Sequence, residues 1–180
     1  MYFVAFLPFC EFFNISLLSF YAADPDYLRK LLKFVDDNRD QCFTLKNPPG
    51  SILRIARLED TIYRDQPDVV DDWGMFYLPW EVKMQVIGVV EGISCPSDEL
   101  VLMTCEDGKL YGYNGEELHL VAQKLEQLRQ GKIEYPSTES YYNGQAFEDM
   151  VEEKLDQEHK KFVESKKKKF LENLKSQKSK

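Results

Sequence analysis

The chain has 180 residues, which is enough for one domain of ordinary size with extensions at its ends. Its 23 basic and 31 acidic residues give a net charge of −8, which argues against general nucleic-acid binding, because phosphate contacts need lysine and arginine. A hydrophobic content of 43% excludes a disordered chain, and two histidines and four cysteines leave little material for metal or triad chemistry. We therefore expect a non-enzymatic binding domain with no cofactor and no metal.

Residues 1–23 are almost entirely apolar, and Glu11 is their only charged side chain. A signal peptide begins with a positively charged region, but no lysine or arginine precedes Arg29. The apolar run is just long enough to span a membrane, but Pro8 interrupts it. Three interpretations of this apolar leader stay open. It is a signal or membrane anchor, a segment packed on the body, or a leader that is not native to the protein.

The number and spacing of the cysteines indicate in which cellular compartment the protein resides. Beyond the leader, the chain has Cys42, Cys95 and Cys105, an odd number without CxxC spacing, which is not a disulfide framework. Free thiols favour a reducing compartment, so we expect a cytoplasmic or nuclear protein. The alternative is a secreted or membrane-anchored protein that uses residues 1–23 as its signal or anchor.

The first predicted element beyond the leader is a helix over residues 24–38. Asp-Pro at its start supplies a cap and a first turn, and apolar residues follow at helical spacing. A short strand is predicted over 42–45, whereas the pattern over 51–58 fits either a strand or a helix. Residues 59–72 are acidic and contain Pro67, so we expect mostly loop there.

A sheet is the clearest prediction for the middle of the chain. Apolar residues alternate over 82–90, which is typical of a strand, and residues 100–104 are a nearly all-apolar second strand. An Asp-Gly turn at Gly108 leads to a return strand over 110–113.

A second tight turn follows at Asn114-Gly115 and leads into an apolar segment over 118–120. Residues 121–130 then predict a helix that Gly131 ends as its C-cap.

The C-terminal part of the chain has a different charge from the body. Residues 132–144 contain Pro, Ser, Asn and Gly and predict a linker, whereas residues 147–175 have no Gly or Pro and predict one long helix. Residues 151–180 carry ten lysines and six acidic residues, a net charge of +4, against −12 for the first 150 residues. Such asymmetry marks either an interaction appendage or a solvated helix whose basic end complements its own dipole.

Residues 99–133 contain a strand, an Asp-Gly turn, a Tyr-Gly-Tyr return strand, and a Leu-Val-Ala sequence before a segment that ends at glycine. This order resembles the core motif of the SUKH superfamily, and especially its herpesvirus US-twenty-two-type branch. The positions that carry the resemblance as framework are Gly108, Tyr111, Tyr113, Val121, Ala122, Leu125 and Gly131.

The resemblance implies an α+β fold without catalytic residues. Members of the superfamily are protein-binding modules that neutralise toxins in bacteria, counter host defences in viruses and regulate cell-wall signalling in fungi. We accordingly expect a single domain with a mixed or antiparallel central sheet, flanking helices and a long C-terminal helix. The expected organisation is an apolar leader over 1–23, a SUKH-like domain over 24–135, a linker over 136–145 and a charged helix over 146–180.

An acidic and aromatic surface is the predicted binding site. Tryptophan and tyrosine are frequent at binding hot spots, and carboxylates would steer a basic partner toward an acidic body. The predicted partner is therefore a protein with a basic surface, not a specific nucleic acid, and a membrane only if the leader is a true anchor. The alternative is that both indoles belong to the core. The predicted partner-binding residues are Asp71, Asp72, Trp73, Tyr77, Trp80 and Glu81.

Overall fold

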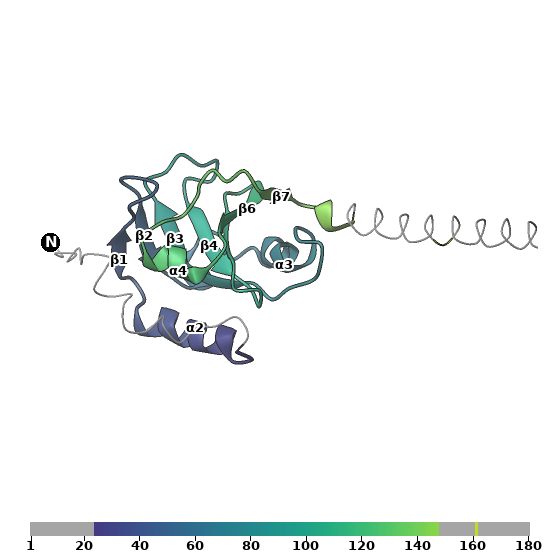
Figure 1. The fold of residues 1–180 in the computed structure, drawn as a ribbon, viewed down its shortest axis with the longest axis horizontal. Helices are drawn as coiled ribbons and strands as arrows, with labels where there is room; N and C mark the ends of the chain where they lie inside the picture. Colours follow the sequence, from purple (N-terminus) through teal and green to yellow (C-terminus); the bar gives the residue numbers. More distant parts are fainter. Residues whose placement is uncertain (1–23, 148–160, 162–180) are drawn as a thin grey trace, which may run out of the picture.

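The computed structural model describes residues 24–147 and Lys161 (Figure 1). The apolar leader lies outside the described residues, and so does the predicted long C-terminal helix beyond Phe147, apart from Lys161. Within the described part of the chain, no helix is both long and apolar enough to cross a bilayer.

A seven-stranded sheet forms the body of the protein. Every strand pairs in an antiparallel manner with its neighbour in the sequence, so the strand order is β1-β2-β3-β4-β5-β6-β7. Four of the six connections are short, which favours pairing of neighbours, whereas residues 56–84 separate β2 from β3 and residues 123–139 separate β6 from β7. The strands are β1 (Cys42–Thr44), β2 (Ile52–Ile55), β3 (Gln85–Glu91), β4 (Leu100–Thr104), β5 (Leu110–Tyr113), β6 (Glu117–Ala122) and β7 (Ser140–Tyr142).

Within residues 24–147, the sheet is accompanied by a few short helices. The longest among the described residues, α2, has 11 residues. The helical elements are α2 (Tyr27–Asp37), the 3-10 helix η2 (Leu58–Asp60), α3 (Pro67–Met75) and α4 (Leu125–Arg129).

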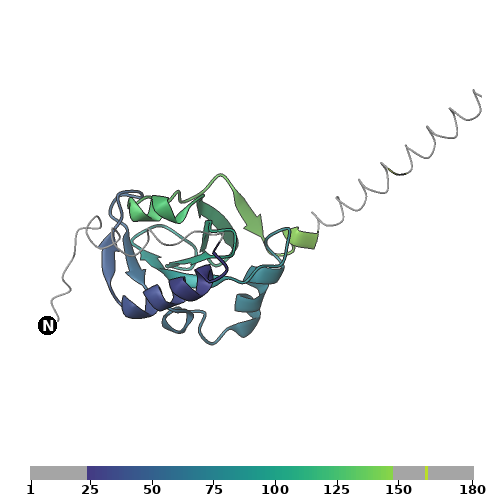
Figure 2. The ribbon, with the colours of Figure 1, turned by 60° about the horizontal axis from the view of Figure 1, so that its bottom comes forward.

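The sheet is covered on both faces, because successive side chains of a strand point to opposite sides. In β4, Leu100 and Leu102 belong to the hydrophobic cluster that contains α2, whereas Val101 and Met103 belong to the cluster that contains α3. The two helices accordingly lie at different sides of the sheet (Figures 1 and 2). All five side chains of β4 are buried, as its almost uniform apolar sequence predicts.

The expected α+β fold class is wrong. The described chain is mostly a seven-stranded antiparallel sheet with a few short helices, and neither a mixed sheet nor a long helix occurs in its described part. The main reason is that several segments with no clear periodicity adopt the strand conformation when a neighbouring strand offers hydrogen bonds. The ambiguous residues 51–58, for example, contribute β2, which pairs with β1 on one side and β3 on the other.

The helix predicted over 121–130 is shorter than expected. Val121 and Ala122 are the last residues of β6, and Ala122 pairs with Leu110 of β5. Lys124 is still extended, with φ −151° and ψ 146°, so α4 begins only at Leu125. Val121 and Ala122 both belong to the hydrophobic cluster that contains α2, and the register shift between Leu110 and Tyr111 of β5 accommodates two consecutive strand residues in one cluster.

The predicted loop over 59–72 contains most of α3. Pro67 is the first residue of this helix, a position that proline favours because its missing N–H would have no helical partner. The predicted linker also contains a strand, β7, which pairs with β6. Both segments are polar in sequence, and contacts with the sheet stabilise their ordered conformations.

The Asp-Gly turn between β4 and β5 is confirmed. Gly108 has φ +72°, in the left-handed region, and its N–H donates to the carbonyl of Cys105 at 3.1 Å.

Replacing Gly108 with valine is expected to lower the free energy of unfolding by about 1–3 kcal/mol, because a β-branched residue is strained at this φ. Asparagine tolerates this region better, so Gly108→Asn should cost less in the same urea titration. Equal midpoints for Gly108→Val and the parent protein would contradict the assigned strain.

Candidate functional site

A surface groove lies between α3 and the segment that leads from Trp80 to β3, and we call it the α3 groove. Its volume is about 690 Å³. Helix α3 provides one wall, the chain before β3 provides the other, and the β4–β5 turn contributes one side chain at the rim. The lining residues are Val70, Asp71, Gly74, Met75, Glu81, Val82, Lys83, Met84 and Glu106.

The two walls of the α3 groove are held together by a backbone contact. The N–H of Val82 donates to the carbonyl of Gly74 at 2.9 Å. A Cβ atom at Gly74 would lie only 2.4 Å from the carbonyl oxygen of Val82, so only glycine permits this approach. On the rim, the N–H of Lys83 donates to Oε2 of Glu106 at 3.2 Å, which positions that carboxylate.

The charge of the α3 groove is acidic. Three carboxylates, of Asp71, Glu81 and Glu106, face one amine, that of Lys83. Asp71 and Glu81 are exposed and make no ion pair within the described residues. The groove also contains apolar surface, since Met75 is 39% exposed and Met84 is half-buried.

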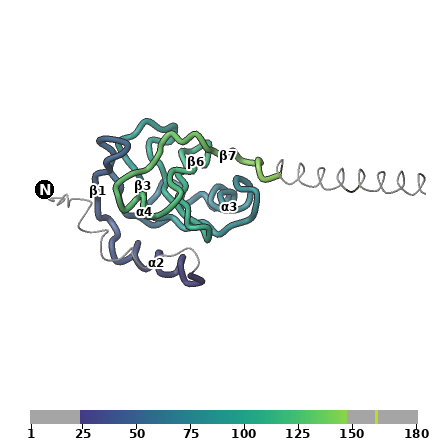
Figure 3. Tube along the Cα trace, in the orientation of Figure 1, coloured from purple at the N-terminus to yellow at the C-terminus, as the bar shows by residue number. Residues whose placement is uncertain are grey.

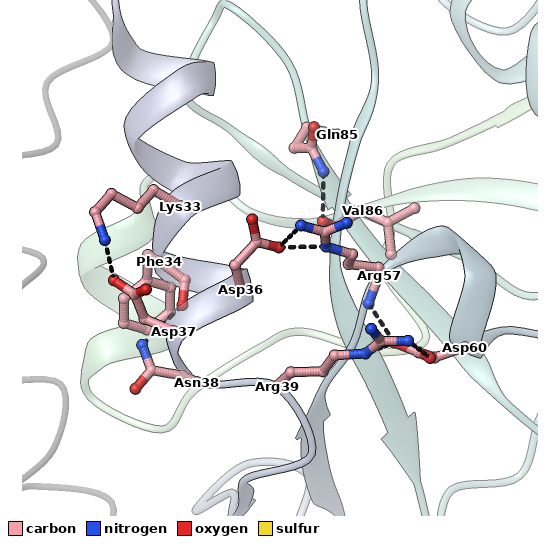
Figure 4. A network of polar contacts seen from close by, with 10 residues as sticks. All are labelled: Lys33, Phe34, Asp36, Asp37, Asn38, Arg39, Arg57, Asp60, Gln85 and Val86. Atoms are coloured by element: carbon pink, nitrogen blue, oxygen red, sulfur yellow. Dashed lines mark hydrogen bonds and ion pairs between the residues drawn. The ribbon is translucent and has the colours of Figure 1, made fainter.

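Two arginines that follow α2 and β2 in the chain are already paired. Arg57, which lies beside Val70 and Met84, forms an ion pair with Asp36 of α2 (Figure 4). Arg39 pairs with Asp60 of η2, and this guanidinium lowers the pKa of the Asp60 carboxyl below its usual value. These contacts join α2 to η2, so neither arginine is available to neutralise Asp71 or Glu81.

Two predicted binding residues, Trp73 and Tyr77, are core residues. They are 1% and 2% exposed, and each ring packs on Tyr113 of β5, with ring centroids 5.3 Å and 5.8 Å apart. Tyr63 also contacts the indole edge-on at 5.3 Å. Burial raises the pKa of Tyr77 far above its usual value. The expectation that these two rings lie at the surface is therefore wrong: Trp73 has the core role that the alternative gave to both indoles, and Tyr77 is buried as well.

The other predicted residues are separated by the fold into three places. Asp71 and Glu81 come together in the α3 groove. Trp80, which directly precedes Glu81, is 52% exposed. Asp72 instead contacts the segment after β7, where its Oδ2 accepts a hydrogen bond from Nδ2 of Asn143 at 2.8 Å.

Three groove residues, Met75, Lys83 and Glu106, were not predicted from the sequence. Met75 ends a helix whose first two turns we expected to be loop, and Glu106 lies on the β4–β5 turn, where it accepts the hydrogen bond from Lys83. A helix start at Pro67 was the one available signal, because it places Val70, Asp71 and Gly74 on one helical face.

The remaining titratable groups form no second site. In the part of the chain that the structure describes, no group of His, Cys, Asp and Glu side chains could hold a metal ion. His119 is buried in β6 with Nε2 3.0 Å from Nδ2 of Asn114, and burial lowers its pKa. Burial also raises the pKa of the Cys105 thiol to about 12, so this cysteine is a poor nucleophile at neutral pH.

The US22-like family model matches residues 24–137, which is most of the described body. The chain belongs to the US22-like family. The matched region includes β1 to β6 and both walls of the α3 groove.

The chain is also similar to uncharacterised proteins of three kinds of virus. The "Uncharacterized gene 87 protein" of Gallid herpesvirus 2 is 26% identical over 72% of this chain and 72% of its own length. The "Uncharacterized protein 005R" of Frog virus 3 is 31% identical over 74% of this chain and 66% of its own length. A fowlpox virus protein, "Uncharacterized protein FPV250", is 29% identical over 47% of this chain and 61% of its own length. No solved structure matches the chain significantly.

Proposed function

We propose that this US22-like protein is a non-enzymatic protein-binding module of SUKH type, and that the α3 groove is its binding site. The partner is a protein segment that carries lysine or arginine on both sides of a large apolar side chain. The single observation that supports this proposal is that two exposed carboxylates without an ion pair within the described residues, Asp71 and Glu81, line the same groove as the apolar side chains of Met75 and Met84.

The chemistry of the α3 groove favours such a partner for two reasons. The carboxylates attract basic segments over roughly 8–10 Å, the Debye length at physiological salt, and so increase the rate of encounter. The partly exposed Met75 and the half-buried Met84 can then bury apolar surface against the partner, at about 25 cal/mol for each Å² removed from water. Methionine suits this role because its unbranched side chain adapts to different apolar groups. Trp80 extends the contact surface beyond the groove.

The proposal places the protein in host–virus conflict, in the cytoplasm or the nucleus. The viral origin of the relatives supports the first part. The free thiols of Cys42, Cys95 and Cys105 support the second part. Fractionation of cells that express a C-terminally tagged full chain tests the compartment, since protease protection in a membrane fraction would contradict it.

Binding can be tested with a short fluorescein-labelled peptide that has leucine and phenylalanine between lysines. The fluorescence anisotropy of this peptide is measured as the full chain is added. We expect saturable binding that weakens as salt is raised. Asp71→Lys combined with Glu81→Lys should weaken it about tenfold, because two attractive charges become repulsive.

Two controls make this experiment specific. Glu116→Lys combined with Glu134→Lys changes the net charge by the same amount at exposed positions outside the groove lining, and should leave the affinity within about twofold. The same peptide with glutamate in place of lysine should not bind. If both double variants lost affinity for the peptide equally, binding would depend only on the net charge of the protein. The groove would then be excluded as the binding site.

A further inference from the structure

The continuous described segment ends at Phe147, which lies against the C-terminal end of α3. After β7, the N–H groups of Gly144 and Ala146 both donate to the carbonyl of Phe76, which directly follows α3. The ring of Phe147 packs on the ring of Phe76 at 5.2 Å, while remaining 53% exposed. Figure 3 shows the chain passing from β7 to the α3 side of the molecule. The segment up to Phe147 therefore lies against Phe76, the residue that follows Met75 of the groove in the sequence.

The sequence beyond Phe147 matches the chemistry that the groove requires. Residues 166–174 read Lys-Lys-Lys-Lys-Phe-Leu-Glu-Asn-Leu, so four consecutive lysines precede Phe170 and Leu171, and Lys175 follows. We call residues 166–175 the basic tail segment. It has five lysines and one acidic side chain, whereas the groove lining has three carboxylates and one amine.

We propose that the basic tail segment occupies the α3 groove of its own chain. Its lysines lie against the carboxylates of Asp71 and Glu81, and Phe170 or Leu171 covers the apolar surface of Met75 and Met84. This inference rests on the proposed function, because it assigns to the same groove an occupant from the same molecule. An external partner then has to displace the tail before it can bind.

The connection between body and tail makes the same chain a better occupant than a second copy. About twenty residues separate Phe147 from the basic tail segment, and they reach about 60 Å when extended and about 30 Å as a helix. A tether of this kind gives an effective concentration on the order of millimolar. At micromolar protein concentration, the tethered tail therefore outcompetes the tail of another molecule by about a thousandfold.

Zero-length carbodiimide cross-linking of the full chain tests the contact, because this reagent joins lysine amines to carboxylates that are already touching. At low protein concentration, the monomer band should contain cross-links from residues 166–169 to Asp71 or Glu81, identified by mass spectrometry. Their yield should exceed that of cross-links from Lys154, Lys160 and Lys161 to the same carboxylates by about fivefold or more, and should fall in high salt. Cross-links found only in a dimer band, or equal yields from both lysine groups, would overturn the proposal.

Competition with the peptide probe separates this inference from the proposed function. A tail variant with Lys167, Lys168 and Lys169 each changed to glutamate should bind the peptide at least about threefold more tightly than the parent chain, because the groove is vacant. The matched control changes Lys154, Lys160 and Lys161 to glutamate, which alters the net charge equally and should leave the affinity unchanged.

The outcomes of that competition are distinct. Tighter binding by the tail variant alone supports both proposals. Binding by all three proteins with equal affinity overturns the tail contact and leaves the proposed function standing. If none of the three proteins binds the peptide, both proposals fail.

Discussion

Replacing Trp73 with alanine is expected to lower the free energy of unfolding by about 3–5 kcal/mol, the usual cost of removing a large buried aromatic side chain. Its indole is 1% exposed and packs at 5.3 Å on both Tyr63 and Tyr113, so the substitution leaves a cavity beneath α3. Urea titration followed by circular dichroism measures the loss. Since this residue lies in the core, any effect of the variant on partner binding should follow from unfolding and not from a lost surface contact.

Trp73→Phe is the matched comparison for this cavity. Phenylalanine fills more of the space than alanine and removes an indole Nε1 that has no hydrogen-bond partner within the described residues. An unpaired buried N–H costs about 1–3 kcal/mol, which offsets part of the lost packing. We therefore expect Trp73→Phe to retain most of the stability. A Trp73→Ala variant that unfolds at the parent midpoint would contradict the core assignment.

Gly74→Ala is expected to destabilise the protein by about 1–3 kcal/mol, against the usual trend for a helix. In an exposed helix interior, alanine is favoured over glycine by about 1 kcal/mol. Here the added Cβ would lie 2.4 Å from the carbonyl oxygen of Val82, which is backbone and cannot rotate away. The steric conflict should exceed the propensity gain, because relieving it separates α3 from the chain at Val82.

A second variant on the same helix isolates the steric effect. Asp71→Ala also introduces alanine into α3, but at an exposed position, so thermal unfolding should shift little or slightly upward. Gly74→Ala should additionally weaken peptide binding, since both walls of the α3 groove meet at this contact. If Gly74→Ala were as stable as Asp71→Ala, the close approach of the two backbones would be wrong.

The strands were predictable where a local pattern determines them. The uniform apolar run of β4, the Asp-Gly turn at Gly108 and the Tyr-Gly-Tyr return of β5 were all identified from short-range signals. The failures concern α3 and the start of α4, where the local signal was weak or favoured another conformation. Val121 and Ala122 fit a helix by composition, but pairing of β6 with β5 keeps them extended, and both belong to the hydrophobic cluster that contains α2.

The candidate site could be predicted only in part from local sequence patterns. An aromatic residue next to acidic residues fits an exposed hot spot and a core anchor equally well, because side-chain type does not determine the direction in which a helix presents it. Trp73 and Asp71 are two positions apart in α3 and therefore face different sides, the first toward the sheet and the second toward the groove. Asp72 faces yet another neighbour, Asn143.

The amino-acid sequence by itself determined the acidic body, the basic C-terminal segment, the central strands and the positions of the tight turns. Each of these depends on composition or on residues close together in the chain. Only the tertiary structure decided that the sheet is antiparallel throughout, that Trp73 and Tyr77 are buried, and that Asp71, Glu81 and Glu106 share one groove. These features depend on contacts between segments far apart in the sequence, such as Gly74 with Val82 and Phe76 with Gly144, whose energies no local pattern contains.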